Sequence, residues 1–226
     1  MPGLFITLEG TEGGGKSTQL PLLADRLQSL GHRLCVLREP GGTAVGEEIR
    51  HTLKHSRGGH GMTPETELLL MNASRAQLVR EVIRPALARG EIVVCDRFYD
   101  STTAYQGYGR QLALDQVAQV IRFAVGETRP DLTLLLRVPV STSEARRRLR
   151  QADPASPANA AAELPDRFEA ADRSFFERVE RGFDAIAAAE PDRVVVVDAS
   201  RGIGEVHESL WQAVQRLLRR RELRAE

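Results

Sequence analysis

Short hydrophobic runs alternate with longer segments of helical periodicity along most of the chain. The runs contain four to seven residues, as strands buried on both faces do, and they lie at 4–8, 34–37, 92–95, 132–138 and 194–197. The periodic segments predict helices, at 16–30, 44–55, 64–89, 112–125, 141–151, 166–189 and 203–221. Pro85 predicts a bend near the end of the third helix, and the Gly-, Tyr- and Thr-rich residues 100–110 predict a loop.

This alternation of strands and helices predicts an α/β fold with a doubly wound, five-stranded parallel sheet and helices on both faces. The 226 residues fit a single domain, 1–226. Ligands of such sheets bind at the carboxyl ends of the strands. Each candidate functional residue below follows a strand or lies on a nearby helix, so we expect them to gather at that edge.

Composition narrows the class of protein. Lys plus Arg and Asp plus Glu each total 31, so the formal net charge is zero and a general attraction to nucleic acid or membranes is not expected. No hydrophobic run approaches the ~18 residues of a membrane span. Cys35 and Cys95 lie in hydrophobic runs, which indicates buried, reduced thiols. We therefore expect a cytoplasmic protein.

A phosphate-binding motif separates the first strand from the first helix. Residues 10–17 fit the pattern G-x-x-x-x-G-K-[ST] in the required strand–loop–helix context. Glycines let successive backbone N–H groups turn toward a phosphate, and the helix directs its positive end at the same point. The expected ATP-binding residues are Gly10, Thr11, Glu12, Gly13, Gly14, Gly15, Lys16, Ser17 and Thr18. The motif alone does not distinguish a kinase from an ATPase or a GTPase. The alternative to phosphate binding is that residues 10–17 form only a Gly-rich turn before an ordinary helix.

A carboxylate follows the third strand. Asp96 ends the hydrophobic run 92–95, and such a residue can hold Mg²⁺ beside the phosphate-binding loop. The structural alternative is an Asp that caps the next segment. Arg97 follows at once, and a cation beside a metal carboxylate suits an acceptor phosphate. The Ser17 hydroxyl is the other metal ligand that this pattern predicts.

Four further stretches resemble those of thymidylate kinase (dTMP kinase), of the bacterial type, among the P-loop nucleoside monophosphate kinases. They are residues 38–43 (Arg-Glu-Pro-Gly-Gly-Thr), 74–77, 96–107 with Asp-Arg and Ala-Tyr-Gln-Gly, and 166–169. The resemblance implies a P-loop NTPase fold and transfer of the γ-phosphoryl group of ATP to dTMP, giving dTDP in dTTP synthesis. It also implies Mg²⁺ and a homodimer.

The resemblance assigns roles residue by residue. It implies acceptor binding by Glu9, Arg38, Pro40, Met71, Arg75, Arg97, Thr102, Tyr105 and Gln106. It places Glu9 near the metal with Ser17 and Asp96. It also implies a short lid, 146–168, which supplies catalytic arginines. The expected catalytic residues are Lys16, Glu12, Arg97, Arg148, Arg150 and Arg167, and Arg146 lies in the same lid region.

The sequence also departs from that family. Met71 stands where an aromatic residue usually stacks on thymine, Arg137 where Asp is frequent, and the lid is longer than usual. Thr102 is a further difference beside the base. Two alternatives follow. Another pyrimidine monophosphate could be the acceptor, or the chain could be a nucleotide-binding protein with weak transferase activity.

Overall fold

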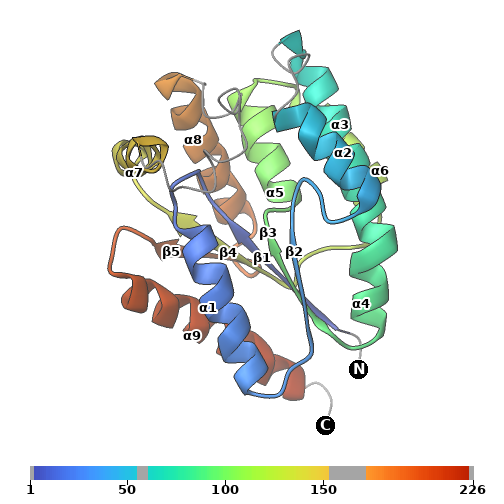
Figure 1. Ribbon diagram of the computed structural model, residues 1–226, viewed down its shortest axis with the longest axis vertical. Helices are drawn as coiled ribbons and strands as arrows, with labels where there is room; N and C mark the ends of the chain where they lie inside the picture. Colours follow the sequence, from blue (N-terminus) through green and yellow to red (C-terminus); the bar gives the residue numbers. More distant parts are fainter. Residues whose placement is uncertain (1–2, 55–60, 153–171, 224–226) are drawn as a thin grey trace.

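The computed structural model describes residues 3–54, 61–152 and 172–223, and its centre is a five-stranded parallel sheet (Figure 1). The strands are β1 (Leu4–Glu9), β2 (Leu34–Arg38), β3 (Ile92–Asp96), β4 (Leu132–Arg137) and β5 (Val194–Asp198). Their order across the sheet is β2-β3-β1-β4-β5, and every neighbouring pair is parallel. The predicted sheet is thus confirmed, and β1 lies at its centre.

Helices cover both faces of this sheet. On one face lie α1 (Lys16–Ser29) and α9 (Ile203–Glu222), which pack beside each other in Figure 1. The remaining helical segments are α2 (Ala44–Lys54), α3 (Pro64–Leu78), η2 (Val79–Ile83), α4 (Arg84–Ala88), α5 (Tyr99–Thr102), η3 (Thr103–Gly109), α6 (Leu114–Val125), α7 (Val140–Ala152) and α8 (Arg173–Ala189). No helix in residues 3–54, 61–152 and 172–223 has both the length and the hydrophobicity needed to cross a bilayer.

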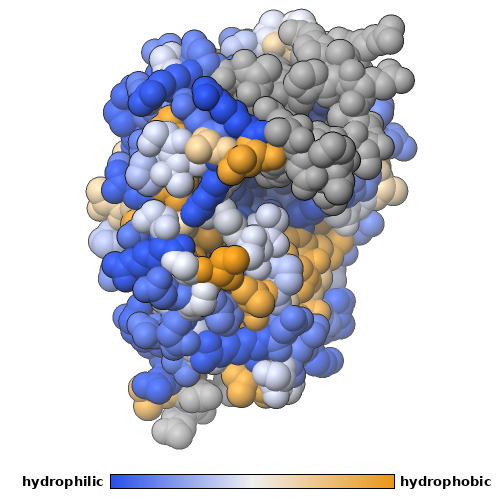
Figure 2. All heavy atoms as spheres, turned by 60° about the vertical axis from the view of Figure 1, so that its left-hand side comes forward, coloured by the Kyte–Doolittle hydropathy of each residue, from blue (hydrophilic) through white to orange (hydrophobic). Residues whose placement is uncertain are grey.

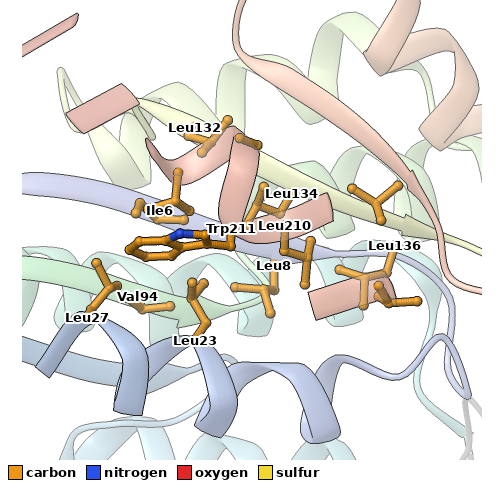
Figure 3. Packing of buried hydrophobic residues seen from close by; sticks show 14 of the residues in the cluster. Ile6, Leu8, Leu23, Leu27, Val94, Leu132, Leu134, Leu136, Leu210 and Trp211 are labelled. Atoms are coloured by element: carbon orange, nitrogen blue, oxygen red, sulfur yellow. The ribbon is translucent and has the colours of Figure 1, made fainter. Parts of the chain in front are cut away.

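The two faces of each strand belong to different hydrophobic cores. Because successive strand side chains point to opposite faces, Ile6 and Leu8 of β1 pack toward α1 and α9, around Trp211 (Figure 3). Phe5 of the same strand packs into the cluster formed with α3, η2 and α6. Trp211 is 3% exposed and belongs to the same cluster. The sheet is therefore held between two apolar layers that fix its carboxyl edge.

Residues 100–110 are not the loop that their composition predicted. They are helical, as α5 followed by the wide helix η3. Their glycines serve close packing instead of a turn: a Cβ at Gly109 would lie 2.6 Å from Phe175 Cε2 on α8, and a Cβ at Gly107 would lie 2.7 Å from Leu114 Cδ2 on α6. A Cβ at Gly182 of α8 would lie 2.9 Å from the ring of Tyr108. This packing holds η3 firmly between the sheet and α8.

The long helix predicted at 64–89 is continuous but changes its winding. Thr63 caps α3 by accepting from the backbone N–H of Thr66. The π-type segment η2 comes next, and Pro85 begins the first turn of α4. Proline lacks the backbone N–H that would donate a hydrogen bond inside an α-helix, and the wider winding of η2 ends at Ile83, just before Pro85. The predicted helix 166–189 is described only as α8 and its cap Asp172, because residues 166–171 lie outside the described residues.

Candidate active site

The phosphate-binding loop joins β1 to α1 and depends on its glycines. Gly10, Gly13 and Gly15 have φ values of 132°, 77° and 91°, which side chains with a Cβ rarely adopt. A Cβ at Gly10 would also lie 2.3 Å from the carbonyl oxygen of Leu136 on β4. Gly15 precedes α1 and offers no side-chain cap. The first N–H groups of α1 therefore stay available to an anion.

Lys16 folds across this loop. Its Nζ donates to the carbonyl oxygens of Gly10 and Thr11, at 3.0 Å each. Burial, and then the charge of Arg97, lower the pKa of Lys16 to about 8. The opposite charges of Asp96, Glu12 and Glu9 only partly offset this effect. A phosphate chain in the loop would supply the negative charge that this buried ammonium lacks.

The start of α7 supports the same loop from its other side. Ser143 Oγ donates to the carbonyl of Glu12 at 2.6 Å, and Arg146 donates to the carbonyl of Gly13 at 3.2 Å. Arg146 also donates to the carbonyl of Ala199 at 3.1 Å. Arg146, at the start of the expected lid, thus binds loop backbone and ties it to the segment after β5.

The remaining lid residues can be placed only in part. Arg148 is exposed on α7. The side chain of Arg150 and the whole of Arg167 lie outside the described residues, as does segment 153–168 of the expected lid.

Two carboxylates end neighbouring strands beside the loop. Glu9 of β1 is fully buried and accepts from the Phe98 N–H at 2.7 Å and from Ser101 Oγ at 2.5 Å. Burial, and then the charge of Asp100, raise the pKa of Glu9 to about 7. Asp96 of β3 has a buried Oδ1 with no hydrogen-bond partner among the described residues.

A free, buried carboxylate oxygen suits a hard divalent cation. Asp96 offers one, whereas both oxygens of Glu9 already accept protein hydrogen bonds. Ser17 is exposed in the first turn of α1, where its hydroxyl can join the same site. Within the described residues, no three His, Cys, Asp or Glu side chains cluster as a metal site. The donor set therefore fits a cation that takes its other ligands from phosphates and water.

Arg97 connects the loop to the acceptor side. Its φ of 70° is unusual for a residue with a side chain. The guanidinium donates to the Gly10 carbonyl at 3.0 Å, to Ser101 Oγ at 2.9 Å and to the Tyr105 hydroxyl at 3.3 Å. Burial opposes its charge, but Tyr105, Asp96 and other acidic groups hold the pKa of Arg97 above its usual range. Burial disfavours the charged form of Tyr105 and so raises the pKa of this residue to about 12.

The expected acceptor residues on α3, α5 and η3 are called the acceptor wall below, and they are Met71, Arg75, Thr102, Tyr105 and Gln106. Arg75 is the most extensively hydrogen-bonded of them. It is 2% exposed, and its Nε and one terminal nitrogen bind Glu39 Oε2 at 2.8 and 2.6 Å. Its other contacts are Asn72 Oδ1, Thr102 Oγ1 and the carbonyl of Phe98. Arg75 thus donates four hydrogen bonds, from its Nε and both terminal nitrogens, in addition to the ion pair with Glu39. The side chain is therefore held rigidly between α3, α5 and the segment after β2.

The other expected acceptor residues fall into two groups. Met71 is half-buried and packs against the cluster of Tyr105 and Phe175, and Gln106 is buried nearby on η3. Arg38, in contrast, is exposed and pairs with Glu47 at 2.9 Å and with the carbonyl of the buried Pro40 at 3.1 Å. The structure thus brings Lys16, Glu9, Glu12, Asp96, Arg97 and Tyr105 together, whereas Arg38 is exposed at the end of β2.

The sequence did not single out three buried polar side chains of this region. Glu39 and Asn72 bind Arg75, and Glu67 binds Gln106. Glu67 was detectable, because it is a charged residue one turn before Met71 on the face that α3 buries. Asn72 lies three residues before Arg75 on the same helix. Glu39 lies 36 residues from Arg75, so no local pattern indicates that pairing.

Comparison with known proteins identifies the family of this chain. Residues 8–210 match the family model described as thymidylate kinase. The thymidylate kinase of Pseudomonas fluorescens (strain SBW25) is 48% identical over 220 residues, which cover 97% of this chain and 99% of that protein. That of Desulforudis audaxviator (strain MP104C) is 46% identical over 222 residues, covering 98% and 94%. The crystal structure of thymidylate kinase from Ehrlichia chaffeensis matches with a TM-score of 0.73 and 31% identity, covering 95% and 99% of the two chains. The chain therefore belongs to the thymidylate kinase family.

Proposed function

We propose that the protein transfers the γ-phosphoryl group of ATP to dTMP, giving dTDP for dTTP synthesis. The observation that carries the proposal is the contact between Arg97 and the carbonyl of Gly10, at 3.0 Å. This contact supports a site in which the guanidinium that would bind the acceptor phosphate lies against the loop that would hold the donor phosphates. Membership of the thymidylate kinase family supports dTMP as the acceptor.

The reaction needs alignment and charge neutralisation more than covalent chemistry. The acceptor phosphate oxygen attacks the γ-phosphorus in line while the bond from that phosphorus to the β–γ bridging oxygen breaks, so ADP leaves and no enzyme intermediate forms. The amides of loop 10–17 and the Lys16 ammonium hold the donor phosphates, while Arg97 holds the acceptor phosphate. Glu12, whose Oε2 is buried without a hydrogen-bond partner among the described residues, faces the same centre. Arg148, Arg150 and Arg167 of segment 146–168 are the proposed additional cations.

Mg²⁺ is the proposed cofactor, held by Asp96 and the Ser17 hydroxyl, with Glu9 close by. The ion would neutralise charge on the β- and γ-phosphates. Omission of the metal, with excess chelator, should abolish ADP formation. Asp96→Asn should raise the Mg²⁺ concentration needed for half-maximal activity. Full activity without a divalent ion would contradict the cofactor assignment.

A coupled assay of ADP formation tests the function directly. We expect dTMP to give the highest kcat/KM among dTMP, dUMP, dCMP and the purine deoxynucleoside monophosphates. A tenfold preference for another acceptor would contradict the dTMP assignment. Turnover near background with normal ATP binding would favour a nucleotide-binding protein instead. The family relationship does not favour either alternative.

We also propose that the protein forms a homodimer through α3 and α6. These helices pack side by side and expose large apolar side chains: Leu69 is 58%, Leu114 44% and Phe123 85% exposed. Figure 2 brings forward the side of the molecule that lies on the left in Figure 1, opposite α3 and α6. That side is mostly hydrophilic, with separate hydrophobic patches. Sedimentation velocity should give a dimer for the wild type and a monomer for Phe123→Asp. A monomeric wild type would refute the proposal. The cytoplasmic location stays a prediction from the sequence.

A further inference from the structure

A fully buried carboxylate lies next to two residues that are expected to bind the acceptor, Met71 and Gln106. Glu67, on α3, is 0% exposed and stands one helical turn before Met71. Its Oε1 accepts from Gln106 Nε2 at 2.7 Å and from Arg110 Nε at 3.3 Å. Its Oε2 accepts from a terminal nitrogen of Arg110 at 3.1 Å. The carboxylate thus holds two residues at the end of η3 against α3.

This contact fixes which way the Gln106 amide turns. A carboxylate can only accept hydrogen bonds, so Gln106 must direct its NH₂ group toward Glu67. The side-chain carbonyl then faces away from Glu67, with the second N–H hydrogen beside it. An amide held in this way offers one acceptor and one donor, in a fixed order, to anything that binds next to it.

That order distinguishes pyrimidine bases. Thymine and uracil present an N3–H donor beside the C4 carbonyl acceptor, whereas cytosine presents an N3 acceptor beside an amino donor. A fixed amide can form two hydrogen bonds with the first pattern. The second pattern sets acceptor against acceptor and donor against donor, which leaves buried polar groups unpaired.

We propose that Glu67 is a positioning residue that locks the Gln106 amide and so makes the acceptor site discriminate against cytosine. The inference rests on the proposed dTMP kinase activity and explains base selection at a site where Met71 replaces an aromatic ring. Methionine packs on any base face and does not distinguish one pyrimidine edge from another.

Arg110 supplies the cationic partner that a buried carboxylate needs. Its guanidinium lies 4.7 Å from the centre of the Phe175 ring on α8, and it is partly exposed. Arg178 of α8 adds a hydrogen bond to the carbonyl of Gly109 at 3.0 Å. The Glu67 contact therefore also joins α3, η3 and α8, and the test must separate positioning from a purely structural ion pair.

The decisive quantity is the ratio of kcat/KM for dTMP to that for dCMP, measured with Glu67→Gln. A glutamine at 67 can donate as well as accept, so the Gln106 amide is free to turn over. We expect the ratio to fall by about 10-fold or more, the equivalent of one hydrogen bond to a charged group. The KM for dTMP should rise while the KM for ATP is unchanged. The matched control is Glu65→Gln, at an exposed position on the same helix, which should leave the ratio unchanged.

A double-mutant cycle with Gln106→Ala shows whether Glu67 acts through Gln106. In the Gln106→Ala background, Glu67→Gln should change the ratio no further. If Glu67→Gln lowers thermal stability but keeps the wild-type ratio, the residue is only structural and the inference is wrong. An undiminished effect in the Gln106→Ala background would overturn it too.

Should Glu67→Gln fail to fold, the exchanged pair Glu67→Gln with Gln106→Glu keeps a carboxylate and an amide in contact but puts the carboxylate toward the base. It should lose the preference for dTMP over dCMP, and a retained preference would refute the inference. Dissociation constants of dTMP and dCMP from calorimetry give the same ratio without turnover. A wild type that binds but does not phosphorylate dTMP would thus refute the proposed function alone.

Discussion

The donor loop and the acceptor wall of this protein are built from different parts of the chain. The donor loop uses backbone groups of eight consecutive residues, 10–17, and its shape follows from glycines with positive φ. The proposed acceptor wall uses side chains from α3, α5 and η3, and two of them, Arg75 and Gln106, are held by buried partners. Arg75 depends on Glu39, and Gln106 depends on Glu67.

This difference determines how each region should respond to substitution. A side chain that reaches across a backbone loop can be removed without leaving a buried group unpaired. A side chain in a buried charge network cannot, because its partner then carries an uncompensated charge. Donor-side changes should therefore affect catalysis alone, whereas acceptor-side changes should affect stability as well.

The largest expected effect is that of Lys16→Ala. Its Nζ contacts only carbonyl oxygens in the described structure, so the fold should keep its melting temperature within about 2 °C. The kcat should fall by ~10³-fold or more, because the cation at the transferring phosphoryl group is lost. Lys54 is the other lysine of the chain, and Lys54→Ala serves as the control with near wild-type activity. A large loss of stability in Lys16→Ala would contradict the comparison.

Arg75→Met should show the opposite behaviour and lower stability strongly. Removal of the guanidinium leaves Glu39 buried without its partner, which typically costs about 3–5 kcal/mol. Urea unfolding followed by circular dichroism measures this loss in the free energy of unfolding. Adding Glu39→Leu should recover most of it, because the unpaired charge is then gone. Arg75→Met that is as stable as the wild type would show that the acceptor wall is not a coupled network.

Arg97 lies where the two regions meet, so its removal tests the boundary between them. Arg97→Ala should raise the KM for dTMP by roughly 10- to 100-fold, the worth of hydrogen bonds from a charged donor to a phosphate. The KM for ATP should change by less than about 3-fold, because loop 10–17 keeps its own backbone contacts. Steady-state kinetics with each substrate varied in turn measures the split. Equal effects on both nucleotides would show that Arg97 serves the donor site.

The same contrast explains which parts of the fold and of the site could be predicted from the sequence. The donor loop is contiguous, and its glycines and lysine have a direct physical purpose, so residues 10–17 identified it without the structure. The hydrophobic runs likewise predicted all five strands, each within one residue at its ends. In both cases the prediction depends on residues that are neighbours in the sequence, and it needs no contact between distant segments.

The acceptor wall could not be predicted in the same way. Resemblance identified Arg75 and Gln106, but their partners Glu39 and Glu67 lie 36 and 39 residues away. Residues 100–110 were wrongly expected to form a loop, because their glycines suggested a turn. In the fold, Gly109 instead allows α8 to approach η3 closely. The contact between Gly109 and α8 thus outweighs the preference of glycine for turns, and no short stretch of the sequence contains both partners of this contact.

The smallest expected effect belongs to Arg137, the departure at the end of β4. Its guanidinium pairs with Asp184 of α8 at 2.7 Å, but the two side chains are 49% and 42% exposed. Such exposed pairs contribute only about 0.2–1 kcal/mol. Arg137→Ala should therefore lower stability by no more than that and change kcat/KM less than about 2-fold. Arg137→Asp, which restores the residue type that the family resemblance leads one to expect, places two carboxylates face to face and should cost slightly more stability, again without a change in turnover. A tenfold rise in turnover for Arg137→Asp would show that this arginine restrains catalysis, and it would return a nucleotide-binding role with weak transfer to consideration.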